Sequence, residues 1–358
     1  MADVKLISLS KKFGGKYAVD HINMNIPDGK IIVFLGPSGC GKTTTLKMIA
    51  GLTIPTEGDI VFNGRSVINI PTEKRNIGMV FQRYLLFPHM NVAQNVGFGL
   101  KIRNTDPIKI KEKVEEALKI VHLSGFERKF PAQLSGGEQQ RVAIARALVI
   151  NTSLLLMDEP LANLDTKLRT EMRSFILSLQ RRLKITTIFV THDQSEAITL
   201  ADKIAVMFNG KVIQFDEPKT LFNHPISPKV ADFLGATNIL KGIVKSCQKN
   251  KCLIESELGE TEVGQSIDFE NGKEVFFTIR PEHININSDK ESKAKNTYVG
   301  KIKEVVYEGG SVRYYLNFGK SIVQVYDRSN KVLSKEKYVS IYFDPEKVWI
   351  FPKNKKIM

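Results

Sequence analysis

Cysteine is scarce in this sequence of 358 residues, which contains only Cys40, Cys247 and Cys252. Their spacing forms no framework for a metal ion or for disulfide bonds, and an odd number of thiols is what a reducing compartment permits. We therefore expect neither a metal cluster nor a disulfide in this chain.

Long hydrophobic runs are also absent. Apolar segments such as Ile31–Leu35 are far shorter than the roughly 18 residues that a membrane-spanning helix requires. The first residues, Met1–Lys5, show no basic stretch followed by an apolar stretch, as a signal peptide would. These observations favour a chain that stays in the cytosol.

Acidic residues are the minority among the charged residues. The sequence has 52 Lys and Arg against 38 Asp and Glu, which gives a formal charge of +14. The basic residues are scattered, and no dense basic cluster is interleaved with aromatic residues. We therefore expect a basic exterior or an affinity for an anionic membrane surface, and no nucleic-acid partner.

The first part of the chain, residues 1–235, alternates short apolar runs with helical patterns. Val114, Leu118 and Val121 recur at helical spacing among Lys and Glu, as in an amphipathic surface helix. The alternation predicts an α/β domain with a largely parallel sheet. The runs that are typical of buried strands are Ile31–Leu35, Leu154–Met157, Thr186–Thr191 and Ile204–Phe208.

The pattern changes in residues 236–358. Short β patterns, such as Val275–Ile279, Val312–Phe318 and Tyr338–Phe343, are separated by Gly, Asn, Asp and Lys. Many short strands at close spacing predict a small all-β barrel or sandwich. We place the boundary between the two domains at Gly235.

A glycine-rich segment, Gly36–Thr43, matches the pattern G-x-x-x-x-G-K-[ST]. It follows a predicted strand and precedes a helical run over Thr44–Ala50, which is the context in which backbone N–H groups surround phosphate oxygens. Lys42 is expected to reach the β- and γ-phosphates of a nucleotide, and the Thr43 hydroxyl to bind Mg²⁺. The expected nucleotide contacts are Gly36, Pro37, Ser38, Gly39, Cys40, Gly41, Lys42, Thr43 and Thr44.

Two carboxylates, Asp158 and Glu159, follow the predicted strand Leu154–Met157. Asp158 is expected to hold the metal ion on the far side of the phosphates. Glu159, on the other face, can orient a water molecule and accept its proton, which fits phosphoryl transfer to water. The alternative, two acidic residues that cap the end of a strand, is plausible only if the pair is considered alone.

A third segment, Leu134-Ser135-Gly136-Gly137-Glu138, precedes a predicted helix over Glu138–Leu148 and so offers a second anion-binding helix end. In their order along the chain, the three segments resemble the motifs of an ABC transporter nucleotide-binding subunit. In that family the phosphate loop of one chain and the Ser135–Glu138 signature of another enclose each ATP. The resemblance therefore implies an ATP-hydrolysing homodimer.

Further positions match motifs of the same family. Gln82 matches the glutamine that senses Mg²⁺ and the attacking water, and His192 the histidine against the γ-phosphate, although a lone histidine is more often structural. Asp165 ends a segment that matches the loop crossing the dimer interface, where Ala162 replaces the usual Ser.

An aromatic residue is expected to stack on adenine in this family. Phe13 matches the position, with Tyr17 as its competitor and a core or turn phenylalanine as the alternative.

The resemblance also implies a helical subdomain over about residues 83–150. Within it, Arg83–Met90 resembles the surface that receives a coupling helix of a membrane subunit. The alternative is an apolar loop packed on its own domain. The family reading implies a peripheral protein on the cytoplasmic face of the cell membrane, bound to two integral-membrane permease subunits and indirectly to an extracytoplasmic solute-binding protein.

Beyond Gly235 the chain resembles the oligonucleotide-binding-like (TOBE) domain of importer ATPases, most clearly at Thr278–Ile284. The segments Ala231–Asn238 and Val305–Tyr315 resemble the polyamine and ferric iron group. We expect spermidine/putrescine import; ferric iron, sugar, glycerol-phosphate or phosphonate import, or an ABC ATPase outside transport, are the alternatives. The β domain could in addition bind a regulatory ligand or protein.

Overall fold

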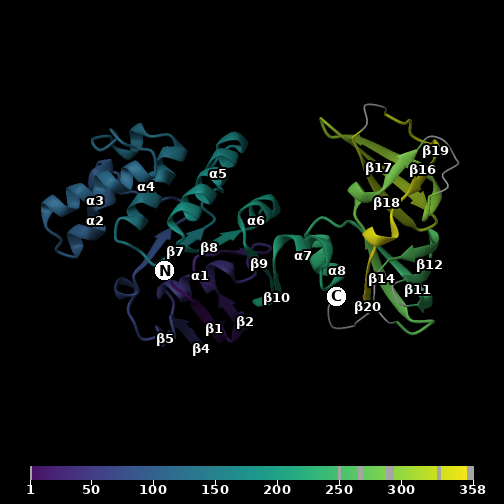
Figure 1. Ribbon diagram of the computed structural model, residues 1–358, viewed down its shortest axis with the longest axis horizontal. Helices are drawn as coiled ribbons and strands as arrows, with labels where there is room; N and C mark the ends of the chain where they lie inside the picture. Colours follow the sequence, from purple (N-terminus) through teal and green to yellow (C-terminus); the bar gives the residue numbers. More distant parts are fainter. Residues whose placement is uncertain (1, 249–250, 265–268, 288–293, 329–331, 353–358) are drawn as a thin grey trace. The chain divides into compact units, whose positions relative to one another are not determined.

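The computed structural model describes residues 2–248, 251–264, 269–287, 294–328 and 332–352 (Figure 1). No helix in these ranges is both long enough and apolar enough to cross a membrane.

The chain divides into two compact units, Met1–Pro218 and Lys219–Met358, so the division falls earlier than the boundary expected at Gly235. The intervening segment carries the short helices α7 (Pro218–Asn223) and α8 (Pro228–Phe233). Helix α8 packs on strands of the second unit, and for this reason the segment belongs with that unit.

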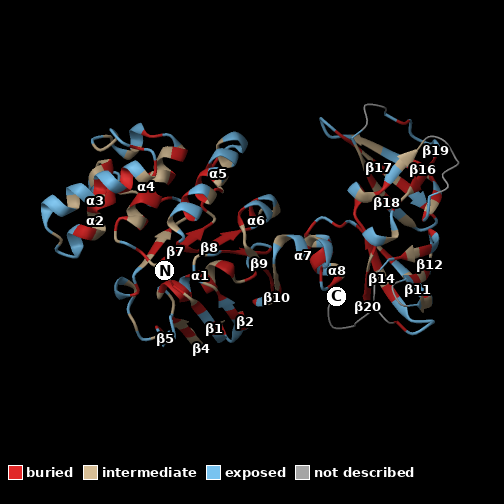
Figure 2. Ribbon diagram, viewed as in Figure 1, coloured by how far each residue is buried: buried red, intermediate tan, exposed pale blue. Residues whose placement is uncertain are grey.

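A six-stranded sheet forms the centre of the first unit, with the strand order β10-β9-β3-β8-β7-β6. All neighbours are parallel except β10, which is antiparallel to β9. Every residue of β3, β7 and β8 is buried, because parallel strands are covered on both faces, and Figure 2 shows this burial in β7 and β8. The predicted α/β architecture is confirmed. The strands are β3 (Ile31–Leu35), β6 (Ile77–Val80), β7 (Leu154–Asp158), β8 (Thr186–Thr191), β9 (Lys203–Phe208) and β10 (Lys211–Asp216).

A second, antiparallel sheet of the same unit has the order β2-β1-β4-β5. Its buried side chains share one hydrophobic core with β3, β7, β8, β9 and helix α1. The strands are β1 (Val4–Phe13), β2 (Lys16–Ile26), β4 (Glu57–Phe62) and β5 (Arg65–Ser66), and α1 spans Lys42–Ala50. A short 3₁₀ turn, η1, spans Thr72–Lys74.

Three helices, α2, α3 and α4, contact one another and lie together within the first unit (Figure 1). In α3, Val114 and Leu118 are buried while the Lys and Glu residues are mostly exposed, so the predicted amphipathic helix is confirmed. Asn91 and Ser135 begin α2 and α4 with reciprocal capping hydrogen bonds. The helices of this unit are α2 (Val92–Ile102), α3 (Pro107–Ile120), η2 (Pro131–Gln133), α4 (Gly136–Leu148), α5 (Thr166–Leu183) and α6 (Gln194–Leu200).

The second unit contains two five-stranded antiparallel sheets, with orders β13-β12-β11-β14-β20 and β15-β19-β16-β17-β18. Their inward side chains, such as Phe277, Tyr314 and Ile341, form one core, so the predicted small all-β domain is confirmed. Its elements are β11 (Asn238–Gln248), β12 (Lys251–Ser256), β13 (Gly259–Val263), β14 (Glu274–Ile279), η3 (Pro281–His283), β15 (Asn285–Asn287), β16 (Thr297–Tyr307), β17 (Val312–Phe318), β18 (Ser321–Asp327), β19 (Tyr338–Tyr342), η4 (Pro345–Lys347) and β20 (Trp349–Pro352).

The expectation of no disulfide was wrong, because Cys247 and Cys252 are bonded. Strands β11 and β12 are antiparallel partners, and their register places these two residues directly opposite each other, with Cα atoms 4.1 Å apart. The bond depends on this register, which the spacing of cysteines in the sequence does not reveal. Cys40 is free and buried.

Candidate functional site

The phosphate-loop segment connects the end of β3 to the start of α1. Gly39 and Gly41 have φ angles of 78° and 106°, which side chains with a Cβ rarely adopt. A Cβ on Gly36 would lie 2.3 Å from the Met207 carbonyl oxygen, so only glycine fits there. The sequence therefore has glycine where the backbone of the loop needs it.

Lys42 is buried beneath this loop, with 4% of its surface exposed. Its Nζ donates to the carbonyl oxygens of Gly36 at 2.7 Å and Pro37 at 2.9 Å. The ammonium group is thus held against the backbone of the loop, where an incoming phosphate could take over its hydrogen bonds.

Thr43 and Asp158 meet at the carboxyl ends of β3 and β7. The Thr43 hydroxyl donates to Asp158 Oδ1 at 2.8 Å. Burial raises the pKa of the Asp158 carboxyl, and the Thr43 hydrogen bond and the nearby lysines oppose this rise only in part. Mg²⁺ prefers hard oxygen ligands, and a hydroxyl beside a carboxylate provides them. Both residues therefore fit a magnesium ion, whose remaining ligands would be nucleotide phosphates and water.

Glu159 and His192 also come together, from the ends of the neighbouring strands β7 and β8. Glu159 has a φ of 44°, and its backbone N–H donates to the Val190 carbonyl at 3.0 Å, which turns the chain sharply after Asp158. Glu159 Oε2 lies 3.2 Å from His192 Nδ1. The pair is partly open to solvent, so both side chains are accessible to a substrate.

Gln82 follows β6, which pairs with β7, and so lies near the same edge of the sheet. Its carbonyl oxygen accepts a hydrogen bond of 2.8 Å from the Asn163 side chain. The backbone of the glutamine segment is thereby tied to the segment that carries Ala162 and Asp165, while the Gln82 side chain is exposed.

The Ser135–Glu138 signature begins α4. Glu138 Oε2 accepts from the Ser135 backbone N–H at 2.7 Å and from its hydroxyl at 2.9 Å, and these bonds lower the pKa of the Glu138 carboxyl. A Cβ on Gly137 would lie 2.8 Å from a methyl group of Leu168 in α5. Close packing against α5 therefore explains why this glycine has no side chain.

Asp165 begins α5 and accepts a hydrogen bond of 2.9 Å from the Leu168 backbone. Because Leu168 also lies close to Gly137, the segment that ends at Asp165 and the Ser135–Glu138 signature are neighbours. Among the hydrogen bonds and ion pairs of the described residues, however, none joins the signature to the phosphate loop Gly36–Thr43.

Phe13 and Tyr17 lie at the two ends of the β1–β2 turn and are 56% and 41% exposed, so either ring is open to a stacking partner. The Lys12 ammonium group lies 4.4 Å from the centre of the Tyr17 ring, and that of Lys11 lies 5.2 Å from the Phe13 ring. Both aromatic residues remain candidates for the adenine contact.

Sequence reasoning missed Glu196, which is 4% exposed in α6. Its Oε2 accepts a hydrogen bond of 2.6 Å from the Thr191 hydroxyl, and its Oε1 lies 3.9 Å from Arg169 in α5. Asp193 caps α6 through the Glu196 backbone N–H at 3.0 Å. This network holds the residues on either side of His192. The spacing of Asp193 and Glu196, which is typical of a helix start, was the available signal.

One part of the Arg83–Met90 segment packs on its own unit, and another part lines a groove. Tyr84 is buried, and Arg146 donates to the carbonyl oxygens of Tyr84 and Leu85, so this part packs on its own unit. His89 and Met90 instead line a groove of about 850 Å³. The remaining lining comes mainly from α2 and α3 and includes Ala93, Gly97, Phe98, Ile102, Pro107, Ile110 and Val114.

Comparison with known proteins defines the class. The ABC transporter family model matches residues 19–162, and the TOBE domain model matches residues 277–351. The solved structure of cbiO1 from Clostridium perfringens, part of the ABC transporter complex cbiONQ, is 33% identical with a TM-score of 0.58, covering 62% of this chain and 90% of that one. The dimeric bacterial ABC transporter cassette MJ0796 is 33% identical with a TM-score of 0.54, covering 60% and 98%.

Curated relatives extend the similarity to almost the whole chain. The spermidine/putrescine import ATP-binding protein PotA of Nitrosomonas europaea is 43% identical over 316 residues, covering 88% of both chains. The PotA protein of Clostridioides difficile is 40% identical over 351 residues, covering 98% of both. This chain therefore belongs to the ABC transporter family of ATP-binding proteins, in the group that carries a TOBE domain, and it is an ATP-binding ATPase.

Proposed function

We propose that this chain is the ATP-hydrolysing subunit of an importer for polyamines such as spermidine and putrescine. The observation that carries the proposal is the sequence identity of 43% and 40% to two spermidine/putrescine import ATP-binding proteins, the second over 98% of the chain. The similarity includes the second unit as well as the ATPase unit.

The phosphates of ATP are proposed to bind the loop Gly36–Thr43, with Lys42 turning from the carbonyl groups of the loop to the β- and γ-phosphates. A magnesium ion held by Thr43 and Asp158 would neutralise phosphate charge. Burial raises the pKa of Asp158 and so favours its protonated form. A cation beside the carboxyl would act in the opposite direction and favour the ionised carboxylate.

Glu159 is the proposed general base, which orients the attacking water and accepts its proton. His192 is proposed to contact the γ-phosphate and, through its Nδ1 at 3.2 Å from Glu159 Oε2, to fix the position of the carboxylate. Gln82 is proposed to sense Mg²⁺ and the attacking water. Phe13, or alternatively Tyr17, stacks on adenine.

The chain is proposed to work as a homodimer. The helix end at Ser135–Glu138 is suited to an anion, and among the described residues no hydrogen bond or ion pair joins it to the phosphate loop of its own chain. This supports binding to the nucleotide of a second copy. An isologous pair of chains would contain two such composite sites. ATP then favours closure because its contacts with the second chain exist only in the closed state.

The groove beside His89 and Met90 is the proposed contact with two membrane permease subunits, on the cytoplasmic face of the membrane. Its apolar lining suits a helix of a partner. Phe98→Glu in this groove should reduce co-purification of the permease subunits from membranes. Ile108→Glu, a matched change on α3 at an exposed residue outside the groove, should leave it unchanged.

Uptake of labelled spermidine in a strain that lacks this gene tests the solute. We expect uptake to be lost, to return with the wild-type gene and with Glu171→Gln, and not to return with Glu159→Gln. Normal spermidine uptake together with loss of ferric iron, sugar, glycerol-phosphate or phosphonate uptake would reassign the solute.

A further inference from the structure

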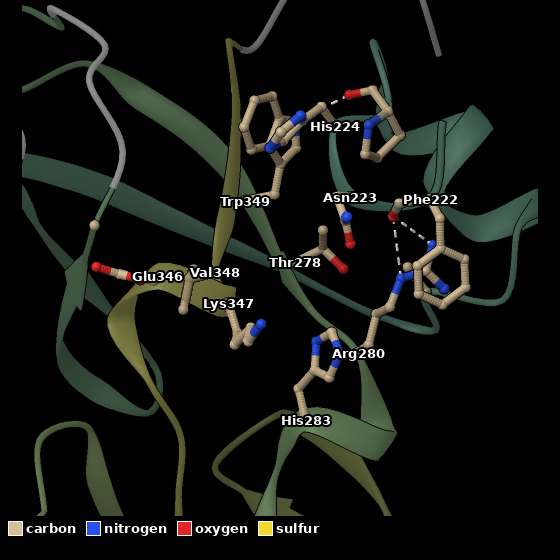
Figure 3. A pocket seen from close by; sticks show the side chains of 13 residues that line it. Phe222, Asn223, His224, Thr278, Arg280, His283, Glu346, Lys347, Val348 and Trp349 are labelled. Carbon is tan, nitrogen blue, oxygen red and sulfur yellow. Dashed lines mark hydrogen bonds between the residues drawn. The ribbon is translucent and has the colours of Figure 1, made fainter. Parts of the chain in front are cut away.

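A cavity of about 530 Å³ lies within the second unit and is not used by the proposed ATPase site. The end of α7, strand β14 and the turns η3 and η4 form its walls, as Figure 3 shows. The side chains that matter for its chemistry are Thr278, Arg280, His283, Lys347 and Trp349.

Two buried polar atoms at this cavity have no hydrogen-bond partner among the described residues: Thr278 Oγ1 and His283 Nδ1. Thr278 is only 4% exposed, and its hydroxyl points into the cavity in Figure 3. Buried polar atoms in native proteins nearly always have a partner, and an unpaired one at a cavity is available to hydrogen-bond a molecule that enters it.

The cavity is also lined by positively charged side chains that form no ion pair with a carboxylate of the described residues. Arg280 is 5% exposed and donates to the carbonyl oxygens of Phe222 and Leu234, while its guanidinium carbon lies 3.3 Å from the centre of the Phe222 ring. Burial lowers its pKa to about 10, so it stays charged at neutral pH. None of the ion pairs found in the described ranges involves Arg280 or Lys347.

The acidic side chains nearby do not fill this role. Glu346 lines the cavity, but its carboxylate points away from the enclosed space in Figure 3. Glu282 acts on Arg280 only at a distance and forms no ion pair with it. A buried cation without a paired anion is unfavourable, and the site therefore favours an anionic ligand.

An aromatic wall stands across the cavity. The rings of His224 and Trp349 lie 4.5 Å apart, and Trp349 Nε1 donates to the Pro225 carbonyl at 2.9 Å, which fixes the indole in place. The cavity is much larger than a single phosphate or carboxylate group requires, and this wall offers a flat apolar surface to the rest of a molecule.

We propose that this cavity binds a small organic oxyanion, with its carboxylate or phosphate group beside Lys347, Thr278 and Arg280 and its apolar part against Trp349. The site is separate from the ATPase site, and the proposal does not depend on the transported solute.

Trp349 is the single tryptophan of the chain, so its fluorescence reports on this cavity alone. The full-length protein is titrated at constant ionic strength with phenyl phosphate, benzoate and the uncharged benzyl alcohol. We expect one or both anions to give a saturable change at concentrations where benzyl alcohol gives none. Saturation by only one anion identifies the head group. No saturation by either anion, or equal binding of benzyl alcohol, overturns the proposal.

Variants locate the binding. Lys347→Ala, an exposed position that folding tolerates, should weaken binding of the anion about tenfold through loss of a charge-assisted contact. Thr278→Val should weaken it several-fold. Lys320→Ala, an exposed lysine of the same unit away from the cavity, should bind as the wild type does. Unchanged binding in Lys347→Ala would contradict the assigned site.

Discussion

The nucleotide site of the first unit and the cavity of the second unit differ in how their polar groups are paired. In the first unit, Thr43 bonds to Asp158 and His192 lies beside Glu159, so these polar groups are partnered before any ligand binds. In the second unit, neither the Thr278 hydroxyl has a hydrogen-bond partner nor Arg280 an ion-pair partner among the described residues. A preformed network suits repeated chemistry, whereas unpaired groups are available to bind a ligand.

The largest expected effect concerns Glu159. Glu159→Gln keeps the shape of the side chain but removes the base, and ATP hydrolysis should fall by roughly 100-fold or more, with ATP binding retained. Phosphate release and nucleotide binding are measured on the same preparation. Glu171→Gln, at an exposed position of α5, serves as the matched control. Turnover near the wild-type rate would remove Glu159 from its role as the base.

Lys42→Ala should weaken nucleotide binding itself, roughly 10- to 100-fold, because a charge-assisted contact with the phosphates is lost. Binding of a fluorescent ATP analogue measures the change. Lys119→Ala, an exposed lysine of α3, should bind as the wild type does. Equal affinities of Lys42→Ala and wild type would contradict the proposed phosphate site.

Two threonines test the difference in pairing directly. Thr43→Val leaves the buried Asp158 oxygen without its donor and should lower the free energy of unfolding by roughly 1–3 kcal/mol in the absence of ligand. Thr278→Val removes a hydroxyl that has no hydrogen-bond partner among the described residues and should cost little or increase stability. Urea unfolding of both variants decides the question, and a larger loss in Thr278→Val would invert the comparison.

The smallest expected effect is a pH dependence at Glu196. Burial is the main cause that raises the pKa of this carboxyl above its ordinary value of 4.5. Between 4.5 and the raised pKa, the native state holds a proton that the unfolded state has released, so this group makes stability fall as the pH rises through that window.

Glu196→Gln should remove this contribution and flatten the fall of Tm with pH. Thermal unfolding of both proteins over a pH series checks the effect. Identical slopes for the two proteins would show that Glu196 does not titrate as its burial indicates.

The strands and turns around the proposed nucleotide site could be predicted from the sequence because their signals are local. Glycine at positions 36, 39 and 41, the apolar strands before Lys42 and Asp158, and small residues before α4 each report a backbone requirement within a few residues. The two kinds of strand can likewise be predicted from short stretches of sequence. Continuous apolar runs indicate buried parallel strands, and alternating apolar and polar residues indicate antiparallel strands with one buried face.

What could not be predicted depends on contacts between distant segments. The bond between Cys247 and Cys252 needs the β11–β12 register, and the Glu196 network needs α5 to pack beside α6. The cavity in the second unit brings Phe222 together with Trp349 from opposite ends of that unit, and no motif marks it. The two compact units divide after Pro218, earlier than the predicted boundary at Gly235, because α8 packs on strands that come later in the chain.

The central claim is that each ATP is hydrolysed between two copies of the chain. Mixing two inactive variants, Lys42→Ala and Ser135→Glu, tests it most directly, because a mixed dimer would join one intact phosphate loop to one intact signature. We expect each variant alone to be inactive and the mixture to recover ATP hydrolysis. A mixture that remains as inactive as its components, although mixed dimers form, would contradict the shared site.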